Sequence, residues 1–438
     1  MHRFTFAVTA ALVVSLAAGG AIAAGTSSWP LSDAEGTDGT NILLVGIDSR
    51  AGISRAERDR LHVNGQACDC TDVMLLAHLS EDERRLSVVS IPRDSYVEFA
   101  DHAHPSHWGK INSAFKHGGG DLAVRTVEKA TGLRVDHYLE ADFTGFVSTV
   151  DRLGGADVCT DKPLLDVNSG LKLAAGTHLL NGDKSLRYVR ARKVSPPGDL
   201  GRVRRQQRLL VGMMARLSAQ GAFAKPAASV LTARKLLASV RTDADTTLVD
   251  LMSLGTRLGR LKAHQTEFAT VPLSEFDHRV PEWGSTLLWH KERSAALWAA
   301  LKEDRSIIDD PLIRPSKDVP VEVDPATVRL RVTDAAVAEG LRASGFVATD
   351  ASGGKDAVRP KGPTVVTYDP YWERSASAVA AALPDARLKA VAGHGSVFDV
   401  AVGTQGGRVA RVVYDRSSVE GAPVPGEQLL CAPKPLLE

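Results

Sequence analysis

Three short apolar runs near the beginning of the chain have the length and composition of buried β-strands. They cover residues 41–47 (NILLVGI), 73–79 (VMLLAHL) and 86–91 (LSVVSI), and polar residues separate them. A continuous apolar run of this length between turn signals is typical of a strand that is covered on both faces. Helix-like and strand-like segments then alternate as far as residue 302, which predicts an α/β domain built in layers.

Charged side chains stand at the ends of these three runs. Asp48 follows the first run, Asp72 precedes the second, and Arg93 and Asp94 follow the third. If the second strand runs antiparallel to the other two, these four residues meet at one edge of the sheet. Ligands bind at strand ends in open sheets, so the pattern predicts a site at this edge.

A second concentration of charge lies between residues 180 and 210. This stretch contains seven arginines and two acids, although the whole chain has a net charge of only +1. The pattern predicts a helix over 182–190, a Pro-Pro-Gly loop, and a second helix from about residue 202. Arginine binds phosphate through two parallel hydrogen bonds and keeps its charge, so the cluster is a candidate phosphate site. A solvated basic surface is the simpler interpretation of the arginines taken alone.

An uncharged apolar run of 21 residues, 4–24, follows Arg3. A helix of this length spans roughly 31 Å, which matches the core of a bilayer. The preceding positive charge predicts a single-pass anchor in the cell membrane, with the amino end in the cytoplasm and the remainder outside. The small residues at 21–23 also fit a cleavage site, so a cleaved signal peptide is the competing interpretation. In either case we expect no nucleic acid partner, because an exported domain does not normally meet nucleic acid.

The four cysteines, Cys68, Cys70, Cys159 and Cys431, permit disulfide bonds in an exported domain. Cys68 and Cys70 are too close together for a redox CxxC motif, and we interpret all four as structural residues on the basis of the oxidising compartment. No histidine stands at zinc-finger spacing from them. A bond from Cys68 or Cys70 to Cys159 is the expected pairing, and Cys431 is the weakest candidate partner.

Composition and proline content suggest how the chain is divided. A hydrophobic content of 44% is ordinary for a globular protein, and 438 residues allow two domains. Four prolines between residues 305 and 325 predict a linker. We therefore expect an anchor (1–24), a polar linker (25–39), a main domain (40–304), a second linker (305–325), a small α+β domain (326–414) and an irregular tail (415–438).

Five motifs in a fixed order resemble a known family. They are NILLVGIDSR, TDVMLL, SIPRDSYV, KINSAFKHGG, and LNGDKSLRYVRAR followed by GDLGRVRRQQ. In this order they resemble the LytR–CpsA–Psr family over residues 41–304, and the ordered set is specific although each motif alone is weak. The segment 326–414 is similar to the small LytR C-terminal domain that is often appended in actinobacteria.

The resemblance implies a membrane-anchored enzyme that acts outside the cell through a layered α-β-α domain with a mixed sheet. Members of the family move a glycopolymer, such as a teichoic acid, capsular polysaccharide or arabinogalactan, from a polyprenyl-diphosphate carrier to peptidoglycan. A sugar hydroxyl of peptidoglycan attacks the phosphorus attached to the polymer, and polyprenyl phosphate leaves. Catalysis would then consist mostly of positioning and charge stabilisation.

The resemblance also assigns roles to individual residues. Four arginines would clamp the diphosphate, three residues would support it, and two aspartates would hold Mg²⁺, with Mn²⁺ as the alternative metal. These are Arg93, Arg190, Arg192 and Arg202 for the clamp, Lys110, Arg205 and Gln206 for support, and Asp48 and Asp72 for the metal. Two carboxylates suffice, because phosphate oxygens complete the coordination of Mg²⁺. The general base would be Asp48, Asp72 or Asp94, and the sequence does not choose among them.

Structural roles remain open for several of these residues. Asp94 could form a salt bridge or a turn, Lys110 could pin a loop, and we expect Arg204 and Arg208 to face solvent. Cys70 stands where the family often has an arginine, which removes one expected phosphate contact. Six apolar residues belong to the core by default, although some of them would line the lipid tunnel that the family has: Phe115, Phe143, Phe146, Leu209, Leu210 and Met213.

Two other functions are alternatives to the transferase. A prenyl-diphosphate phosphatase or pyrophosphatase would use the same site, with water in place of the sugar hydroxyl. A non-catalytic envelope protein would only bind the lipid or the polymer. The joint presence of Asp48, Asp72, Arg93, Arg190 and Arg202 favours an enzyme.

Overall fold

The computed structural model describes residues 38–50, 53–64, 70–101, 107–194, 198–219, 240–244, 246–314, 318–353 and 360–431. The expected membrane anchor (1–24) and Cys68 lie outside these described residues. Within the described ranges, no helix is both long enough and apolar enough to cross a membrane.

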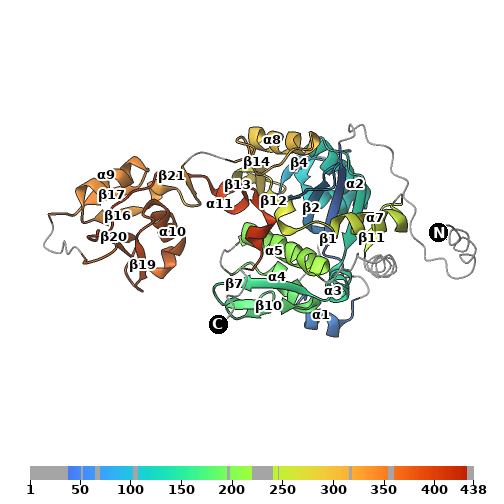
Figure 1. Cartoon of the computed structure of the whole chain (residues 1–438), viewed down its shortest axis with the longest axis horizontal. Coiled ribbons are helices and arrows are strands. Elements are labelled where there is room, and N and C mark those ends of the chain that lie inside the picture. Colours follow the sequence, from blue (N-terminus) through green and yellow to red (C-terminus); the bar gives the residue numbers. More distant parts are fainter. Residues whose placement is uncertain are drawn as a thin grey trace, which may run out of the picture.

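A seven-stranded mixed sheet forms the centre of the larger domain, in the order β11-β6-β1-β2-β3-β12-β22 (Figure 1). Strand β2 is antiparallel to both β1 and β3, which is the arrangement under which the charged strand ends meet at one edge. Strand β6 is parallel to β1, and β12 is parallel to β3. Six strands of this sheet are β1 (Thr40–Ile47), β2 (Thr71–Leu79), β3 (Leu86–Ser90), β6 (His137–Ala141), β11 (Arg241–Thr242) and β12 (Thr266–Thr270).

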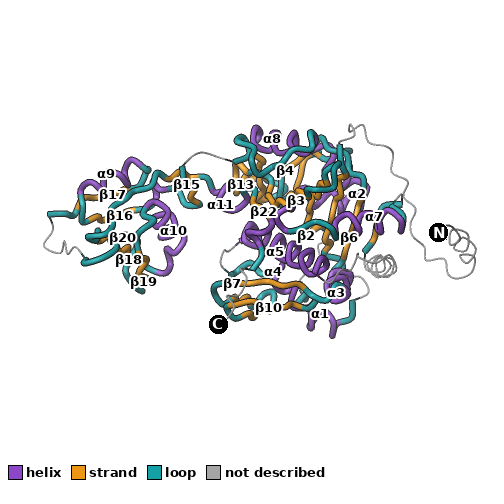
Figure 2. Tube along the Cα trace, in the orientation of Figure 1, coloured by secondary structure: helices purple, strands orange, loops and turns teal. Residues whose placement is uncertain are grey.

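Helices cover both faces of this sheet, which confirms the predicted α-β-α layers (Figure 2). One face packs against two helices, and their apolar side chains form a continuous core with the sheet. The other face is covered by three helices that pack less completely. The first layer contains α2 (Ile111–Thr131) and α8 (Lys291–Lys302), and the second contains α3 (Phe143–Arg152), α5 (Gly198–Ala219) and α7 (Leu248–Leu258).

Short hairpins and two small helices complete the larger domain. Most of them were not predicted. The three-residue strands carry little periodic signal, whereas one hairpin with strands of eight and six residues was missed despite its length. The paired strands are β4 (Tyr96–Glu98) with β5 (Trp108–Lys110), β7 (Ala156–Thr160) with β10 (Gly176–Leu180), β8 (Leu164–Asp166) with β9 (Leu171–Leu173), and β13 (Leu273–Val280) with β14 (Gly284–Trp289). The small helices are α1 (Arg55–Leu61) and α4 (Gly182–Arg190).

The smaller domain is an α+β unit with its own buried core, as predicted. A five-stranded sheet in the order β17-β16-β20-β18-β19 packs against two helices. Its strands are β16 (Arg329–Val332), β17 (Val347–Asp350), β18 (Val365–Tyr368), β19 (Arg387–Ala390) and β20 (Val397–Ala401), and its helices are α9 (Ala335–Ala343) and α10 (Glu373–Ala382).

Two parts of the predicted domain division are wrong. In the expected linker, Ile307 and Ile313 are buried in the core of the larger domain. The expected irregular tail instead forms α11 (Arg416–Gly421) and β22 (Val424–Pro425), and β22 pairs with β12 at the edge of the central sheet. Leu429 is buried in the core of that domain as well. Apolar side chains therefore bring the end of the chain back to the larger domain, despite its proline-rich composition (Figure 1).

Two short strands lie side by side where the chain enters and leaves the smaller domain, and their Val321 and Val412 are buried in its core. Strand β15 (Val319–Val321) leads into the smaller domain, and β21 (Val412–Tyr414) leads out of it. They pair in parallel, and we call this pair the stalk. Lys162 of the larger domain also forms an ion pair with Glu373 of the smaller one, with 3.1 Å between Nζ and Oε1.

The cysteines do not pair as expected. Cys159 on β7 and Cys431, which follows the returning segment, are both free thiols, whereas Cys70 is disulfide-bonded. Burial and a hydrogen bond with Cys159 raise the pKa of the Cys431 thiol to about 12. The residue expected to be the weakest partner is therefore the neighbour of Cys159, because the end of the chain folds back onto β7.

Candidate functional site

A β-bulge brings two aspartates to the same end of β1 and β2. Gly46 pairs with Val73 and Ile47 pairs with Thr71, so Asp72 is an extra residue in β2. Asp48 lies just beyond the bulge, where its backbone N–H donates to the carbonyl oxygen of Cys70 at 3.0 Å. A bulge redirects a side chain and often occurs beside a functional site. The predicted meeting of Asp48 and Asp72 at one sheet edge rests on this local geometry.

The Asp72 carboxylate is held in its ionised form by arginines. Arg93 donates from Nη1 to Oδ1 of Asp72 at 2.6 Å. Burial opposes ionisation, but the positive charges of Arg93, Arg202 and Arg192 outweigh it and lower the pKa of Asp72. Three of the four arginines expected to clamp a diphosphate therefore act on one carboxylate.

Asp94 lies between two cations beside this pair. Its Oδ2 is 3.4 Å from Nε of Arg93, and its Oδ1 is 3.0 Å from Nζ of Lys110. Asp94 thus forms salt bridges, as one of its two structural alternatives predicted. The same contact places Lys110 at the edge of the charged cluster.

Arg190 lies at the end of α4, between the aspartates and the apolar interior. Its Nη1 donates to the backbone oxygen of His62 at 3.0 Å, and its guanidinium lies 5.3 Å from the ring centre of Phe143. Burial lowers the pKa of Arg190, while the charges of Asp72 and Asp48 act in the opposite direction. The guanidinium is therefore positioned by α1 and α3 and faces both carboxylates electrostatically.

Arg192 is positioned by a buried carboxylate that sequence reasoning missed. Asp166 on β8 accepts hydrogen bonds at Oδ2 from the backbone N–H of Arg192 (2.6 Å) and of Lys193 (2.9 Å). Burial alone would raise the pKa of Asp166, but these bonds and two further backbone N–H donors lower it. An acid 26 residues before its partner gives no local signal, so only the fold reveals this contact.

The arginines of α5 divide into two groups. Arg202 is buried and its charge acts on Asp72, so it belongs to the charged cluster. Arg205 instead donates to the backbone oxygen of Ala191, and burial lowers the pKa of Arg205 to about 10. Arg205 therefore holds the segment between α4 and α5, and its expected support of a diphosphate stays a prediction. Gln206 donates to the backbone oxygen of Val189 at 3.5 Å.

Arg204 and Arg208 do not face solvent as expected. Both are half-buried, because α5 packs against β7 and α4. Arg204 donates to Oε1 of Gln207 at 3.3 Å, and burial with the nearby charge of Arg208 lowers the pKa of Arg204. Arg208 forms a hydrogen bond with Tyr188.

Arg50 supplies a cation that sequence reasoning did not assign. Its Nε and Nη2 donate to the two carboxylate oxygens of Asp48, at 3.0 and 3.1 Å. The arginine lies two residues after Asp48 in the motif GIDSR, which was the available signal. Asn112 donates to the sulfur of Cys70 at 3.7 Å, so Cys70 is part of the support below this pair.

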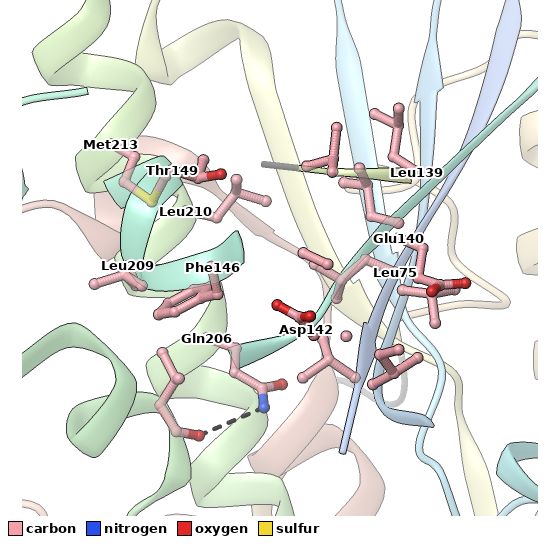
Figure 3. A pocket seen from close by; sticks show the side chains of 18 of the residues that line it. Leu75, Leu139, Glu140, Asp142, Phe146, Thr149, Gln206, Leu209, Leu210 and Met213 are labelled. Atoms are coloured by element: carbon pink, nitrogen blue, oxygen red, sulfur yellow. Dashed lines mark hydrogen bonds between the residues drawn. The ribbon is translucent and has the colours of Figure 1, made fainter. Parts of the chain in front are cut away.

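An apolar cavity of about 380 Å³ opens beside the charged cluster. Figure 3 shows Leu209, Leu210 and Met213 on its helical side, facing Leu75 and Leu139 on the sheet. Of the six apolar residues considered from the sequence, Phe115 packs in the opposite core and the other five line the cavity: Phe143, Phe146, Leu209, Leu210 and Met213.

The charged cluster separates this cavity from a second, smaller one. The small cavity is lined by Arg93, Asp94 and Leu287. Four residues line both cavities and form the boundary between them: Asp72, Val73, Arg202 and Gln206. The arrangement can hold a ligand that is apolar at one end and anionic at the other. The small cavity, of about 20 Å³, has room for a water molecule and not for a sugar.

Few protein groups at this site could hold a metal ion. Among the residues that the structure describes, no group of three or more His, Cys, Asp or Glu side chains is suited to a metal ion. Asp48 and Asp72 supply two carboxylates at the site, and oxygen ligands of this kind suit Mg²⁺. Such an ion would need its remaining ligands from phosphate and water.

Comparison with known proteins gives the same family that the motifs indicated. The crystal structure of Bacillus subtilis TagV covers 62% of this chain and all of its own, with 24% identity and a TM-score of 0.50, which shows the fold. A probable cell wall biosynthesis protein LcpB of Corynebacterium glutamicum is 38% identical over 200 residues, 45% of this chain and 46% of its own.

A Bacillus cereus protein named polyisoprenyl-teichoic acid–peptidoglycan teichoic acid transferase TagU is 34% identical over 174 residues. This match covers 40% of this chain and 51% of TagU, so the chain spans about half the length of the curated relatives it matches. The model of the LytR_cpsA_psr family matches residues 16–303. The chain belongs to the LytR_cpsA_psr family.

Proposed function

We propose that this chain is a phosphotransferase that moves a glycopolymer from a polyprenyl-diphosphate carrier to a sugar hydroxyl of peptidoglycan. The junction between the apolar cavity and the charged cluster carries the proposal, because Asp72, Arg190 and Arg202 line the mouth of that cavity. A matching ligand is apolar at one end and anionic at the other, as a prenyl diphosphate is. The name of the relative TagU supports the same class of reaction.

The arginines would bind the diphosphate and stabilise charge on its leaving oxygen. Charge-assisted hydrogen bonds from guanidinium groups are strong, and they strengthen further where water is excluded. Arg202 is buried and Arg190 lies against Phe143, so both act in a partly dry environment. Arg93 would approach from the other side of Asp72.

We also propose that Asp48 and Asp72 hold a Mg²⁺ ion. Both carboxylates lie at the end of the same strand pair and beside the arginines, which fits an ion that completes its coordination with phosphate oxygens. When bound, the ion would neutralise part of the diphosphate charge. Arg50 and Arg93 would then share these carboxylates with the metal.

The proton of the acceptor hydroxyl would pass to Asp94. A depressed pKa makes Asp72 a weak proton acceptor, and Asp48 is a metal ligand in this proposal. Asp94 is held by Arg93 and Lys110 but is not assigned to the metal. Asp94 borders the small cavity on the side away from the apolar one. In the proposal the acceptor approaches Asp94 from the side of the β4–β5 hairpin, where Asp94 contacts Lys110.

Membrane attachment belongs to the same proposal. The apolar run at 4–24 would anchor the chain, with the described domains outside the cell, where peptidoglycan lies. The identity of the glycopolymer is left at the level of the class.

The deciding experiment is incubation of the full chain with a prenyl-diphosphate-linked oligosaccharide, peptidoglycan oligomers and Mg²⁺. Mass spectrometry should find a covalent glycan–peptidoglycan adduct together with prenyl monophosphate. Asp72→Asn should abolish the adduct, whereas Asp399→Asn, which alters an exposed ion pair of the smaller domain, should not. Prenyl phosphate released without any adduct would instead identify a hydrolase, and no turnover at all would identify a binding protein.

A further inference from the structure

The outer face of the β4–β5 hairpin continues from the charged cluster. Tyr96 and Lys110 are directly paired across the two strands, and Glu98 is paired with Trp108. Cross-strand partners share a face, and so do residues two apart along a strand. Tyr96, Trp108 and Lys110 therefore lie on one face, and Lys110 is the residue whose Nζ lies 3.0 Å from Asp94.

The opposite face of this hairpin is fixed against the core. Val97 is buried, and Gly109 lies so close to Trp283 that a Cβ there would be 2.5 Å from its ring. The same Cβ would be 2.7 Å from the ring of Phe99. Because the inner face admits no larger residue at Gly109, the hairpin is a rigid support for its outer side chains.

Three rings form a continuous surface on the outer side. The ring centres of Tyr96 and Trp108 are 5.6 Å apart, and those of Tyr96 and His278 on β13 are 5.8 Å apart. Trp108 is 43% exposed, which is unusual for so large an apolar side chain. We call Tyr96, Trp108 and His278 the aromatic platform.

The platform lies on the acceptor side of the charged cluster. Leu287 of β14 lines the small cavity, and its backbone N–H donates to the carbonyl oxygen of Asp94 at 2.9 Å. The same β13–β14 hairpin carries His278. The prenyl chain would occupy the apolar cavity beyond Asp72 and Arg202, whereas the platform lies beside Lys110 and Asp94, neither of which lines that cavity.

We propose that the aromatic platform binds the glycan strand of the acceptor, next to the sugar that reacts. This inference rests on the proposed function. A pyranose ring presents C–H groups on its faces, which pack on aromatic rings, while its hydroxyl groups can bond to Lys110, Glu98 or His278. Two residues along a strand span about 7 Å, so a sugar on Trp108 places its neighbour beside Lys110 and Asp94.

The test measures binding of a soluble, uncrosslinked peptidoglycan glycan strand to the full chain, by calorimetry and without any lipid donor. Trp108→Ala should weaken this binding roughly 5- to 10-fold, because one aromatic contact is lost, and Tyr96→Ala should act similarly. Trp108→Phe should restore most of the affinity. Tyr371→Ala, which removes an aromatic ring 83% exposed on the smaller domain, is the matched control and should have no effect.

Kinetics separate this inference from the proposed function. In the transfer assay, Trp108→Ala should raise KM for the glycan acceptor and leave binding of the prenyl diphosphate unchanged. If Trp108→Ala and Tyr96→Ala both bind the glycan strand as tightly as the wild type, the platform proposal is wrong, even if the chain catalyses transfer. If these variants lose affinity for the glycan strand but the wild-type chain catalyses no transfer, the platform proposal is supported and the transferase proposal is wrong.

Discussion

The two faces of the central sheet differ although the same strands build them. Leu76 of β2 is 0% exposed and packs with α2 and α8 in a closed core. Its neighbour Leu75 points the other way, toward α3, α5 and α7, and lines the apolar cavity. Strand alternation puts identical side chains into these two environments.

This difference shows how one fold combines stability with ligand binding. Protein interiors are normally packed to the density of organic crystals, and the α2–α8 face follows this rule. The other face leaves about 380 Å³ open, beside the buried cations. We therefore expect substitutions on the packed face to change stability, and substitutions on the open face to change ligand binding.

The largest expected effect is on the packed face. Leu76→Ala should lower the free energy of unfolding by about 3–5 kcal/mol, because the surrounding core cannot collapse around the lost atoms. Leu75→Ala should cost at most about 2.7 kcal/mol, since its side chain already borders a cavity. Urea denaturation of both variants measures the difference. Equal losses would show that the two faces are packed alike.

The next effect concerns the mouth of the cavity. Arg202→Ala and Arg190→Ala should each weaken prenyl-diphosphate binding roughly 10- to 150-fold, because each removes charge-assisted hydrogen bonds. The double variant should lose less than the product of the two, since both residues bind one ligand. Arg331→Ala, which breaks an exposed ion pair with Asp399, is the control. Arg204 and Arg208 are unsuitable controls, because both are half-buried. Effects as mild as that of the control would indicate a diffuse basic surface.

A third effect tests the support beneath the arginines. Asp166→Ala leaves the backbone N–H groups of Arg192 and Lys193 without their acceptor and should cost about 1–3 kcal/mol of stability. Because Arg192 then loses its position, turnover should fall as well. Asp166→Glu serves as the conservative comparison. Unchanged turnover in a destabilised Asp166→Ala variant would show that Arg192 does not depend on this carboxylate.

The smallest effect depends on the length of the ligand. Leu75→Phe should fill part of the cavity and exclude about two methylene groups of a long prenyl chain, roughly 1.6 kcal/mol or about tenfold in affinity. A farnesyl diphosphate, which needs less of the cavity, should lose less. The measurement is the affinity for the long-chain prenyl diphosphate divided by the affinity for farnesyl diphosphate, taken for the variant and for the wild type. A ratio that does not change would place the prenyl chain elsewhere.

Local sequence signals were sufficient for part of the site. Asp48, Asp72 and Arg93 were predicted to meet because each stands at the end of an apolar strand. The ends of such strands can be predicted from where the apolar run stops in the sequence. The helix–loop–helix containing Arg190 and Arg202 was predicted from two helical patterns on either side of a Pro-Pro-Gly loop.

Long-range packing decided the rest. Arg202 and Arg205 stand three residues apart on α5, and their burial among different elements gives them different partners. Asp166 accepts a hydrogen bond from Arg192, which is 26 residues later in the sequence. The outer face of the β4–β5 hairpin depends on the cross-strand register, which cannot be predicted from the sequence of two three-residue strands. The return of the chain to the larger domain likewise depended on a vacant sheet edge at β12.

The stalk has a mechanical consequence. Because β15 and β21 run in the same direction and their Val321 and Val412 are buried in the core of the smaller domain, the stalk belongs to that domain. The returning chain crosses to the larger domain directly after it, where Asp415 pairs with Arg293 of α8 at 3.1 Å. The ion pair between Lys162 and Glu373 is exposed and adds little to this fixed crossing. The smaller domain is therefore tethered by a short crossing, and any group it carries meets the larger domain at a raised effective concentration. Cutting the chain after residue 314 would remove this module and the last strand of the central sheet together.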